Sequence, residues 1–221
     1  MPKLALLAPV VAIVMFMADA PAIGADTPDT PALLAKSLEQ LSALQGFSCD
    51  FEQTLSFSDG SEQHYAGTLD VLRPRRFRWH YKLPYEQLYI SDGDIIWHYE
   101  PDLLQAEVLE GLDAVDPVVM KLLDGRIGGR DVLLLAQEQP QEEPQITRYQ
   151  VQIGEGPAMW LGIRSDARLA YIESLDVMDN RNRITLNRFS HVAPQSELFR
   201  FTPPEGVDVI GAAFGVVAAE E

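Results

Sequence analysis

The fold is decided by residues 65–99, which read YAGTLDVLRPRRFRWHYKLPYEQLYISDGDIIWHY. Apolar and polar residues alternate through most of this stretch, so that Phe77 and Trp79 fall on the opposite side of the chain from Arg78. A period of two with one apolar side is typical of antiparallel strands that have one dry and one wet face. The pair Asp92-Gly93 favours a hairpin turn. The stretch therefore predicts a curved antiparallel sheet with a dry, aromatic-rich face, and it leaves open whether protein or a ligand fills that face.

Short alternating segments of the same kind recur before and after this stretch. We expect strands at residues 47–57, 104–108, 149–153, 160–164, 169–177, 183–191 and 198–201, and a short apolar helix or strand at residues 132–135. The polar, proline-bearing segment 137–145 is expected to be a surface loop, because strands of the same style resume after it. Short strands about a dozen residues apart, without long helices between them, indicate an all-β sheet or barrel with a few helices added.

Two helices are expected to cover the sheet. The first, Thr30–Gly46, has Thr30 as its N-cap, Pro31 at the first helical position and a stripe of leucines along one side. The second, Asp116–Gly125, is apolar on most of its circumference. Its apolar residues are Val118, Val119, Met120, Leu122 and Leu123. A helix this short is not stable alone in water, so it must lie on an apolar surface.

The first 25 residues have the features of a secretory signal peptide. Lys3 supplies a short positive region, residues 4–17 are uncharged and apolar, and Ala25 offers a small residue before a cleavage site. The apolar run is too short to span a bilayer comfortably, and an N-terminal membrane anchor is the alternative. We therefore expect a signal peptide at residues 1–25 and a single domain at residues 26–221.

The chain carries a formal net charge of -16. Cleavage after residue 25 would leave this value unchanged, because it removes one lysine and one aspartate. A nucleic-acid partner requires a basic surface, and anionic lipid attracts basic segments. The charge therefore argues against both kinds of partner and suits proteins that carry basic patches.

Cys49 is the only cysteine, so it cannot form a disulfide within the chain. It alternates with Phe47 and Phe51 on the apolar side of its expected strand, and we interpret it as a small buried hydrophobe. A reactive thiol is the alternative interpretation.

The sequence contains no recognisable catalytic or metal-binding motif. It lacks H-E-x-x-H, G-x-S-x-G, a Walker loop and G-x-G-x-x-G, and its four histidines have no paired spacing for zinc. Its acidic residues fall mostly at turns and on wet faces, where no carboxylate pair stands out. We therefore expect that the protein is not an enzyme and has no catalytic residue and no metal site.

Three motifs within the organising stretch share one family's spacing. They are Arg73-Pro74-x-x-Phe77-x-Trp79, Pro84-x-x-Gln87 and Ser91-Asp92-Gly93-x-x-x-Trp97-x-Tyr99-x-Pro101. This spacing resembles that of the periplasmic outer-membrane lipoprotein carriers of the Lol sorting pathway, the LolA family. The segment Phe201-Thr202-Pro203-Pro204-x-Gly206-Val207 resembles the same family, so the likeness runs from about residue 30 to residue 208. Residues 137–190 match in pattern only, and the apolar ending 209–219 departs from the expected polar one.

The resemblance and the pattern together give the expected fold class, mainly β with α. It is an incomplete, half-open antiparallel β-barrel whose concave side is covered by short lid helices. As the resemblance implies, the protein is a periplasmic carrier that uses no cofactor. It would receive acylated lipoproteins from an inner-membrane ABC-type lipoprotein-releasing complex and pass them, as a monomer, to an outer-membrane lipoprotein receptor. Two alternatives stay open: a periplasmic carrier of another lipid on the same fold, and an envelope scaffold whose filled barrel binds no ligand.

The dry face is the expected site for acyl chains. Its candidate lining residues are Phe51, Leu69, Val71, Phe77, Trp79, Ile90 and Trp97. Each buried methylene contributes about 0.8 kcal/mol, so three chains buried in a rigid site would bind too tightly to be handed over. A carrier therefore needs a shallow, partly filled or gated site. The residues alone leave open whether helix 116–125 gates the site or is ordinary core, and the resemblance implies that it is the lid.

Arg73 is the expected latch of this lid. It ends a strand with an apolar face, and an arginine that points inward must be paired or hydrogen-bonded. Carbonyls at the C-terminal end of the lid helix would accept its hydrogen bonds. The residues alone leave open a solvated arginine, whereas the resemblance implies a latch in the ligand-free form. Phe77 matches the family position implicated in taking up and handing on the lipoprotein, and on the residues alone it could equally be core.

Overall fold

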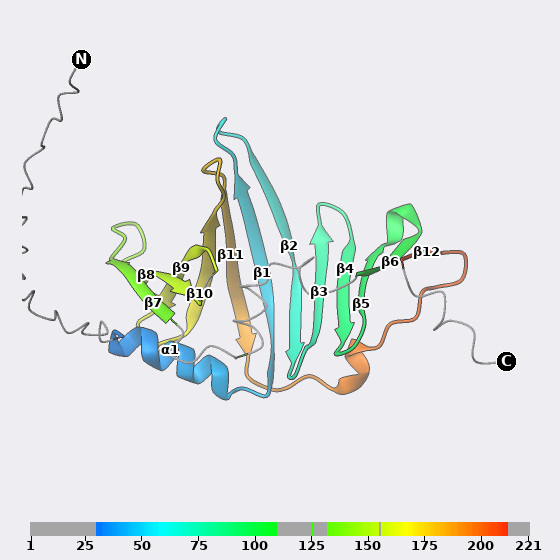
Figure 1. The fold of residues 1–221 in the computed structure, drawn as a ribbon, viewed down its shortest axis with the longest axis horizontal. Helices are drawn as coiled ribbons and strands as arrows, with labels where there is room; N and C mark the ends of the chain where they lie inside the picture. Colours follow the sequence, from blue (N-terminus) through cyan, green and yellow to red (C-terminus); the bar gives the residue numbers. More distant parts are fainter. Residues whose placement is uncertain (1–29, 110–124, 126–131, 155, 212–221) are drawn as a thin grey trace, which may run out of the picture.

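The computed structural model describes residues 30–109, 125, 132–154 and 156–211. The expected signal peptide lies outside the described residues, and so does the expected lid helix except for Gly125. The lid positions Val118, Val119, Met120, Leu122 and Leu123 are therefore not described. Within the described part, one α-helix lies against one large sheet (Figure 1). No helix of this part is long and apolar enough to cross a membrane.

The elements follow one another mostly as short strands. Helix α1 spans Ala32–Ala43. The strands are β1 (Gly46–Ser56), β2 (Glu62–Leu72), β3 (Arg76–Leu83), β4 (Gln87–Asp92), β5 (Ile96–Glu100), β6 (Gln105–Leu109), β7 (Val132–Glu138), β8 (Ile146–Ile153), β9 (Ala158–Arg164), β10 (Leu169–Leu175), β11 (Arg181–Ser190) and β12 (Asp208–Ile210). The short 3-10 helices η1 (Pro101–Leu103) and η4 (Ser196–Phe199) precede β6 and β12.

The sheet consists of two antiparallel meanders that meet in the middle. Its strand order is β12-β6-β5-β4-β3-β2-β1-β11-β10-β9-β8-β7. The first meander runs from β1 to β6, the second runs from β7 back to β11, and β11 pairs antiparallel with β1. Strand β12 adds to β6 in parallel. Because β7 and β12 end the sheet without pairing with each other, the sheet is not closed, and the predicted half-open antiparallel fold is confirmed.

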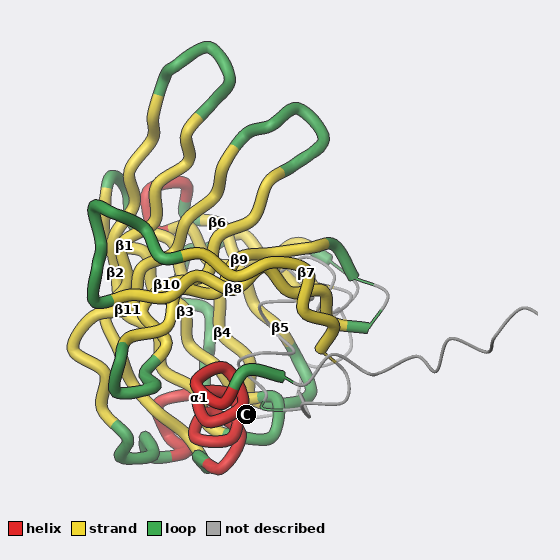
Figure 2. The backbone as a smooth tube through the Cα atoms, turned by 90° about the vertical axis from the view of Figure 1, so that its left-hand side faces the viewer, coloured by secondary structure: helices red, strands yellow, loops and turns green. Residues whose placement is uncertain are grey.

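Helix α1 lies across one end of the second meander, beneath β7 to β11 in Figure 1 and nearly end-on in Figure 2. Its buried leucines Leu34, Leu38 and Leu41 join the same hydrophobic cluster as Phe47 of β1 and Val71 of β2. The leucine stripe therefore places the helix against the apolar side of the sheet, as the spacing of the leucines predicted. We call this apolar side of the sheet the concave face.

The helix boundaries differ from the expected ones at both ends. The N-cap is Pro31 and makes no side-chain capping hydrogen bond, so Thr30 is not the cap. At the other end Leu44 is already extended, and Gly46 is the first residue of β1, paired with Leu72. The helix ends early because the chain must join the strand ladder, and a Cβ on Gly46 would clash with the carbonyl oxygen of Val71.

The expectation of a strand at residues 198–201 was wrong. This segment forms the end of η4 and an extended stretch outside the ladder, and Phe199 is buried against the sheet where η4 contacts β3 and β4. The alternating apolar residues there pack onto the sheet as a cover and do not pair with it. By contrast, the ambiguous segment 132–135 lies within β7. The predicted loop 137–145 is present but begins at residue 139, because Gln137 and Glu138 still pair in β7.

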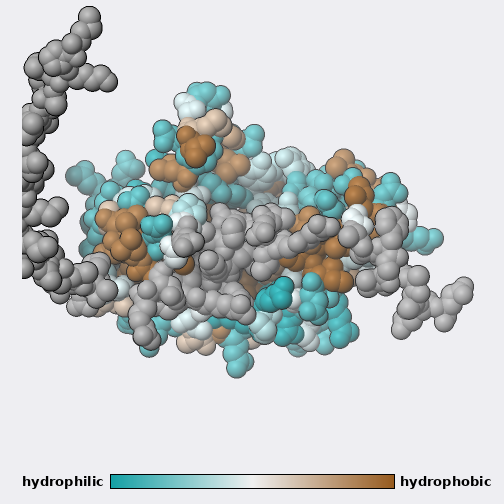
Figure 3. All heavy atoms as spheres, in the orientation of Figure 1, coloured by the Kyte–Doolittle hydropathy of each residue, from teal (hydrophilic) through white to brown (hydrophobic). Residues whose placement is uncertain are grey.

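The free edge at β7 carries apolar side chains at the surface. Leu133 and Leu135 are about half exposed, and Figure 3 shows an apolar surface at this end of the molecule. Further apolar areas interrupt the hydrophilic surface at the upper centre and toward the right of the same view.

Candidate functional site

The concave face brings together five of the seven predicted acyl-chain residues. Phe51, Leu69, Val71, Phe77 and Trp79 belong to one buried cluster, which they share with the leucines of α1. The ladders explain this: Leu69 lies opposite Trp79, and Val71 lies opposite Phe77, so each pair points to the same side of the sheet. Phe51 packs edge-to-face on Trp79, with ring centroids 5.6 Å apart.

Ile90 and Trp97 do not lie on the concave face, so this part of the expected lining was wrong. Trp79 faces Tyr89 across the ladder, and Tyr89 stacks on His98 at 4.2 Å, which puts these residues on the concave side. Ile90 and Trp97 pair with each other one position further along and therefore point to the opposite side.

The opposite face is also covered, which explains why the alternation there was misleading. Trp97 packs against Phe201 at 5.6 Å, and Val207 and Val209 pack on the same cluster as Ile90. The segment after β11 thus crosses the outside of β3 to β6. Strands β4 and β5 are buried on both sides, and a period of two cannot then tell which side faces the cavity.

Arg73 holds the C-terminal end of α1. Its Nη1 donates to the carbonyl oxygen of Ser42 at 3.0 Å and to that of Leu44. These are the carbonyls that a helix leaves unsatisfied at its C-terminus, where a positive charge is also favourable. Among the described residues, the helix whose end Arg73 binds is therefore α1, whereas the sequence predicts the end of segment 116–125.

The same guanidinium lies against Gly125, the last residue of the expected lid segment. A Cβ on Gly125 would be 2.6 Å from both Nη atoms of Arg73, closer than real contacts allow. The φ of Gly125 is +69°, in the left-handed region that favours glycine. Arg73 is thus in contact with α1 on one side and with residue 125 on the other.

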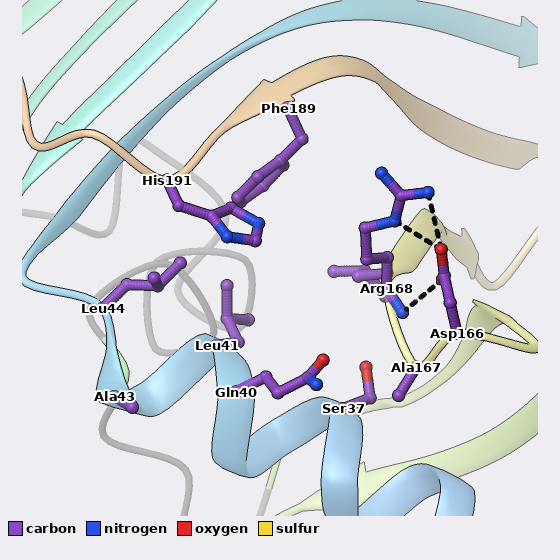
Figure 4. Close-up of a pocket in the computed structure, with 11 residues that line it drawn as sticks. Ser37, Gln40, Leu41, Ala43, Leu44, Asp166, Ala167, Arg168, Phe189 and His191 are labelled. Carbon is purple, nitrogen blue, oxygen red and sulfur yellow. Dashed lines mark hydrogen bonds and ion pairs between the residues drawn. The ribbon is translucent and has the colours of Figure 1, made fainter.

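A cavity of about 430 Å³ opens beside α1, and we call it the helix pocket (Figure 4). It is lined by Ser37, Gln40, Leu41, Ala43, Leu44, Asp166, Ala167, Arg168, Leu169, Phe189 and His191. Phe189 stacks on Phe47 with centroids 4.7 Å apart, so the apolar wall of the pocket is continuous with the concave face. The ion pair between Arg168 and Asp166 forms a polar rim on the side away from His191. The volume is within the range of small-ligand sites.

The sequence is similar to known proteins over most of its length. Residues 42–202 match the family model described as "Outer membrane lipoprotein carrier protein LolA". The chain belongs to the LolA family. A protein named outer-membrane lipoprotein carrier protein from Methylibium petroleiphilum is 32% identical over 191 residues, covering 80% of this chain and 91% of the relative. One of the same name from Nitrosospira multiformis is 33% identical over 180 residues, covering 73% and 80%. The solved structure of a LolA-superfamily protein from Nitrosomonas europaea has a TM-score of 0.46 at 13% identity, covering 76% of this chain and 96% of that chain.

A second cavity of this LolA-family protein lies on the concave face, toward the end of the strands away from α1, and encloses about 310 Å³. We call it the aromatic cup. Its wall includes Gln53, Tyr65, Trp79, Tyr81, Tyr89 and Asn182, drawn from β1, β2, β3, β4 and β11. Those residues of the wall that the structure describes are all uncharged. Tyr81 sits at the centre of the ring contacts, edge-to-face with Phe51 at 4.9 Å and stacked on Trp79 at 5.9 Å. Burial raises the pKa values of Tyr81 and Tyr89, so both hydroxyls keep their protons at neutral pH.

Cys49 is buried in the core of the LolA-family fold, as its alternation with phenylalanines predicted. Burial, with a smaller contribution from the charge of Asp70, raises the pKa of its thiol to about 12. A thiol that does not ionise is a poor nucleophile. The described residues also contain no cluster of three or more His, Cys, Asp or Glu side chains that could hold a metal ion.

Neither cavity was anticipated from the sequence. The helix pocket combines α1 with residues 166–169 and 189–191, and the aromatic cup combines residues 53–89 with 182–184. Both sets become neighbours only because β11 returns to pair with β1. A signal for the cup was present in the four tyrosines between residues 65 and 89, but their role depends on this long-range pairing.

Proposed function

We propose that this LolA-family protein is a periplasmic carrier that binds the acyl chains of lipoproteins released from the inner membrane and delivers them to the outer membrane. The observation that carries the proposal is the apolar concave face of an open sheet, with α1 held at one end by Arg73. The relatives named outer-membrane lipoprotein carrier protein support the same function. The carrier acts by burying chains and releasing them, and it forms no covalent intermediate.

The physical basis of the transfer is burial that can be reversed. Each methylene moved from water to the concave face is worth about 0.8 kcal/mol, so acyl chains provide ample affinity. Contacts that exist only in the ligand-free form subtract from this affinity and make release possible. The hydrogen bonds from Arg73 to the end of α1, together with its contact with Gly125, are the candidate contacts of this kind.

The partners follow from the proposed route. An inner-membrane ABC-type lipoprotein-releasing complex would load the carrier, and an outer-membrane lipoprotein receptor would unload it. A carrier with a net charge of -16 is attracted to partner surfaces with basic patches, which raises the rate of encounter. The proposal includes a monomeric carrier and an N-terminal signal peptide over residues 1–25.

The test is the binding of a fluorescent acyl probe to the exported protein. We expect saturable binding in the wild type. In Arg73→Leu we expect roughly tenfold tighter binding and slower release, because the hydrogen bonds that compete with the ligand are lost. Arg78→Leu is the matched control, since Arg78 lies on the neighbouring strand β3 between Phe77 and Trp79 and therefore points away from the concave face. It should bind the probe like the wild type.

The outcomes separate the proposal from its alternatives. Mass spectrometry of material that co-purifies with Arg73→Leu should find protein-linked acyl chains. Free lipid in their place would identify a carrier of another lipid. If neither the wild type nor Arg73→Leu binds the probe while both are folded, the protein is an envelope scaffold and the carrier function is excluded.

A further inference from the structure

The aromatic cup differs from the rest of the concave face in being polar at its wall yet free of charge. Within the described part of the chain, tyrosines and amides line the cavity without an acidic or basic residue among them, in a protein whose net charge is -16. A site that recognised an ion would present a counter-charge, because burying an unpaired ion is costly. The cup therefore suits a neutral polar group.

The ring geometry argues against an aromatic cage for a cation. Tyr65 packs edge-to-face on Tyr81 with an angle of 85° between the rings, and Tyr89 packs on Tyr81 at 71°. The ring of Trp79 lies parallel to that of Tyr81, with centroids 5.9 Å apart. Because the tyrosine rings contact one another at steep angles, their faces are not turned together toward one central ligand.

The hydrogen bonds of the cup engage the amide oxygens of Gln53 and Asn182 and leave a donor at the end of the chain of bonds. The hydroxyl of Tyr81 donates to Oε1 of Gln53 at 3.0 Å, and Nε2 of Gln53 donates to Oδ1 of Asn182 at 2.9 Å. This relay fixes the amide of Asn182 with its oxygen engaged, so its NH₂ group is the end of the relay and a donor. A ligand that completes the relay must accept a hydrogen bond.

Trp79 supplies a second donor, which is more deeply buried than the NH₂ group of Asn182. The residue is only 5% exposed, and its Nε1 is buried without a hydrogen-bond partner among the described residues. A buried indole N–H nearly always has an acceptor, because leaving it without one costs a substantial part of its solvation. Trp79 also lines the cup, so a ligand that displaces the side chains around it is the acceptor best placed to reach this nitrogen.

The cup is also the polar end of the acyl-chain surface. Trp79 and Ile184 belong both to its wall and to the buried cluster of the concave face. Along β1, Phe47 lies beside α1 and Gln53 lies in the cup, on the order of 20 Å further at the usual rise per residue. A chain that lies along this face with its end near α1 would place its head at the cup.

We infer that the aromatic cup binds the neutral ester and amide carbonyls that join the acyl chains to the first residue of the lipoprotein. This inference rests on the proposed function, because it presupposes an acylated cargo on the concave face. The indole N–H of Trp79 and the NH₂ group of Asn182 donate to these carbonyl oxygens, and the tyrosine rings cover the glyceryl carbons. The cup thereby distinguishes an acylated protein from a bare hydrocarbon chain.

The test compares two synthetic lipopeptides with identical chains and peptide. One carries glyceryl esters, and in the other each ester carbonyl is replaced by a methylene group to give an ether. We expect the wild type to prefer the ester form by about fivefold, the value of one neutral hydrogen bond. Asn182→Ala should reduce this preference toward equality, whereas Asn187→Ala, on the same strand outside the cup, should retain it.

A second measurement follows ligand binding in the wild-type protein itself, and a variant serves only to assign the signal. The indole N–H proton resonance of Trp79, assigned with Trp79→Phe, should move downfield when the ester lipopeptide binds and move less with the ether. Equal affinity for the two lipopeptides, with no difference at this resonance, would overturn the role of the cup and leave the carrier function intact. Failure of both lipopeptides and of the simple acyl probe to bind would overturn the carrier function and the inference with it.

Discussion

The guanidinium of Arg73 occupies the space that a β-carbon of Gly125 would need. The same guanidinium donates to the carbonyl oxygens of Ser42 and Leu44 at the end of α1. One side chain therefore connects the only described α-helix to the last residue of the expected lid segment. Any change that forces Arg73 and residue 125 apart should act on the same equilibrium as removal of the arginine itself.

Gly125→Ala should imitate Arg73→Leu although the arginine is still present. The added methyl group cannot lie 2.6 Å from the Nη atoms, so either the guanidinium or residue 125 must move. We expect binding of the acyl probe to become tighter, up to about tenfold, because a charge-assisted hydrogen bond of the ligand-free form is weakened. The measurement is a probe titration combined with the rate of probe release.

The control for this prediction is Gly154→Ala. Gly154 has a φ of +59°, close to that of Gly125, but nothing lies within 4 Å of the position that its β-carbon would take, so alanine brings backbone strain without a clash. It should lower the free energy of unfolding by about 1 kcal/mol, and the thermal midpoint with it. Probe binding should stay as in the wild type. Equal effects of the two variants on binding would show that strain and not the contact with Arg73 is responsible.

Brominated acyl chains should quench Trp79 and spare Trp97. The three tryptophans are Trp79, Trp97 and Trp160, so proteins with a single tryptophan are obtained by replacing the other two with phenylalanine. Trp79 lies on the concave face, whereas Trp97 packs under Phe201 on the opposite side of the sheet. Bromine quenches only at near contact, and strong quenching of Trp97 would place the chains on the wrong side of the sheet for our proposal.

The alternation of residues predicted the sheet well, because β1 to β3 have one apolar and one polar side. It could not assign Ile90 and Trp97, since both faces of β4 and β5 are covered and both sides of these strands carry large apolar residues. The cover is formed by Phe199 and Phe201, which are more than a hundred residues away in sequence. Only the tertiary structure determines which side of such a strand faces the cavity.

The sequence predicted those features of the candidate site that depend on residues close together in the chain. Arg73 was recognised because an inward arginine at a strand end needs carbonyl partners, and it does have carbonyl partners. That these belong to α1 could not be deduced, because the sequence offered two helix ends of the same kind. The relay from Gln53 to Asn182 joins residues 129 positions apart and has no local signature.

Glu173→Leu should destabilise the protein strongly while leaving the carrier surface unchanged. This carboxylate is only 3% exposed on the face away from the cavity, and it accepts a hydrogen bond from Nη2 of Arg148 at 2.9 Å. Its removal leaves the largely buried Arg148 with only the more distant and exposed Glu138 as a charge partner, which should cost about 3 kcal/mol. Glu138→Leu is the control, because Glu138 is an exposed partner of the same arginine at 3.7 Å and should cost less than about 1 kcal/mol. Denaturant unfolding gives both values, and similar losses in the two variants would contradict the assigned burial.

Cys49 should make the stability of the protein fall at alkaline pH. Burial raises the pKa of its thiol from 9.0 to about 12, so the folded state keeps the proton that the unfolded state releases. The contribution of this group to the free energy of unfolding is complete below pH 9 and is lost as the pH rises toward 12, by about 1 kcal/mol at pH 10. Cys49→Ala should lack this component, so its free energy of unfolding should fall less between pH 7 and pH 10 than that of the wild type. Identical decreases in the two proteins would mean that Cys49 ionises as easily in the folded chain as in the unfolded one.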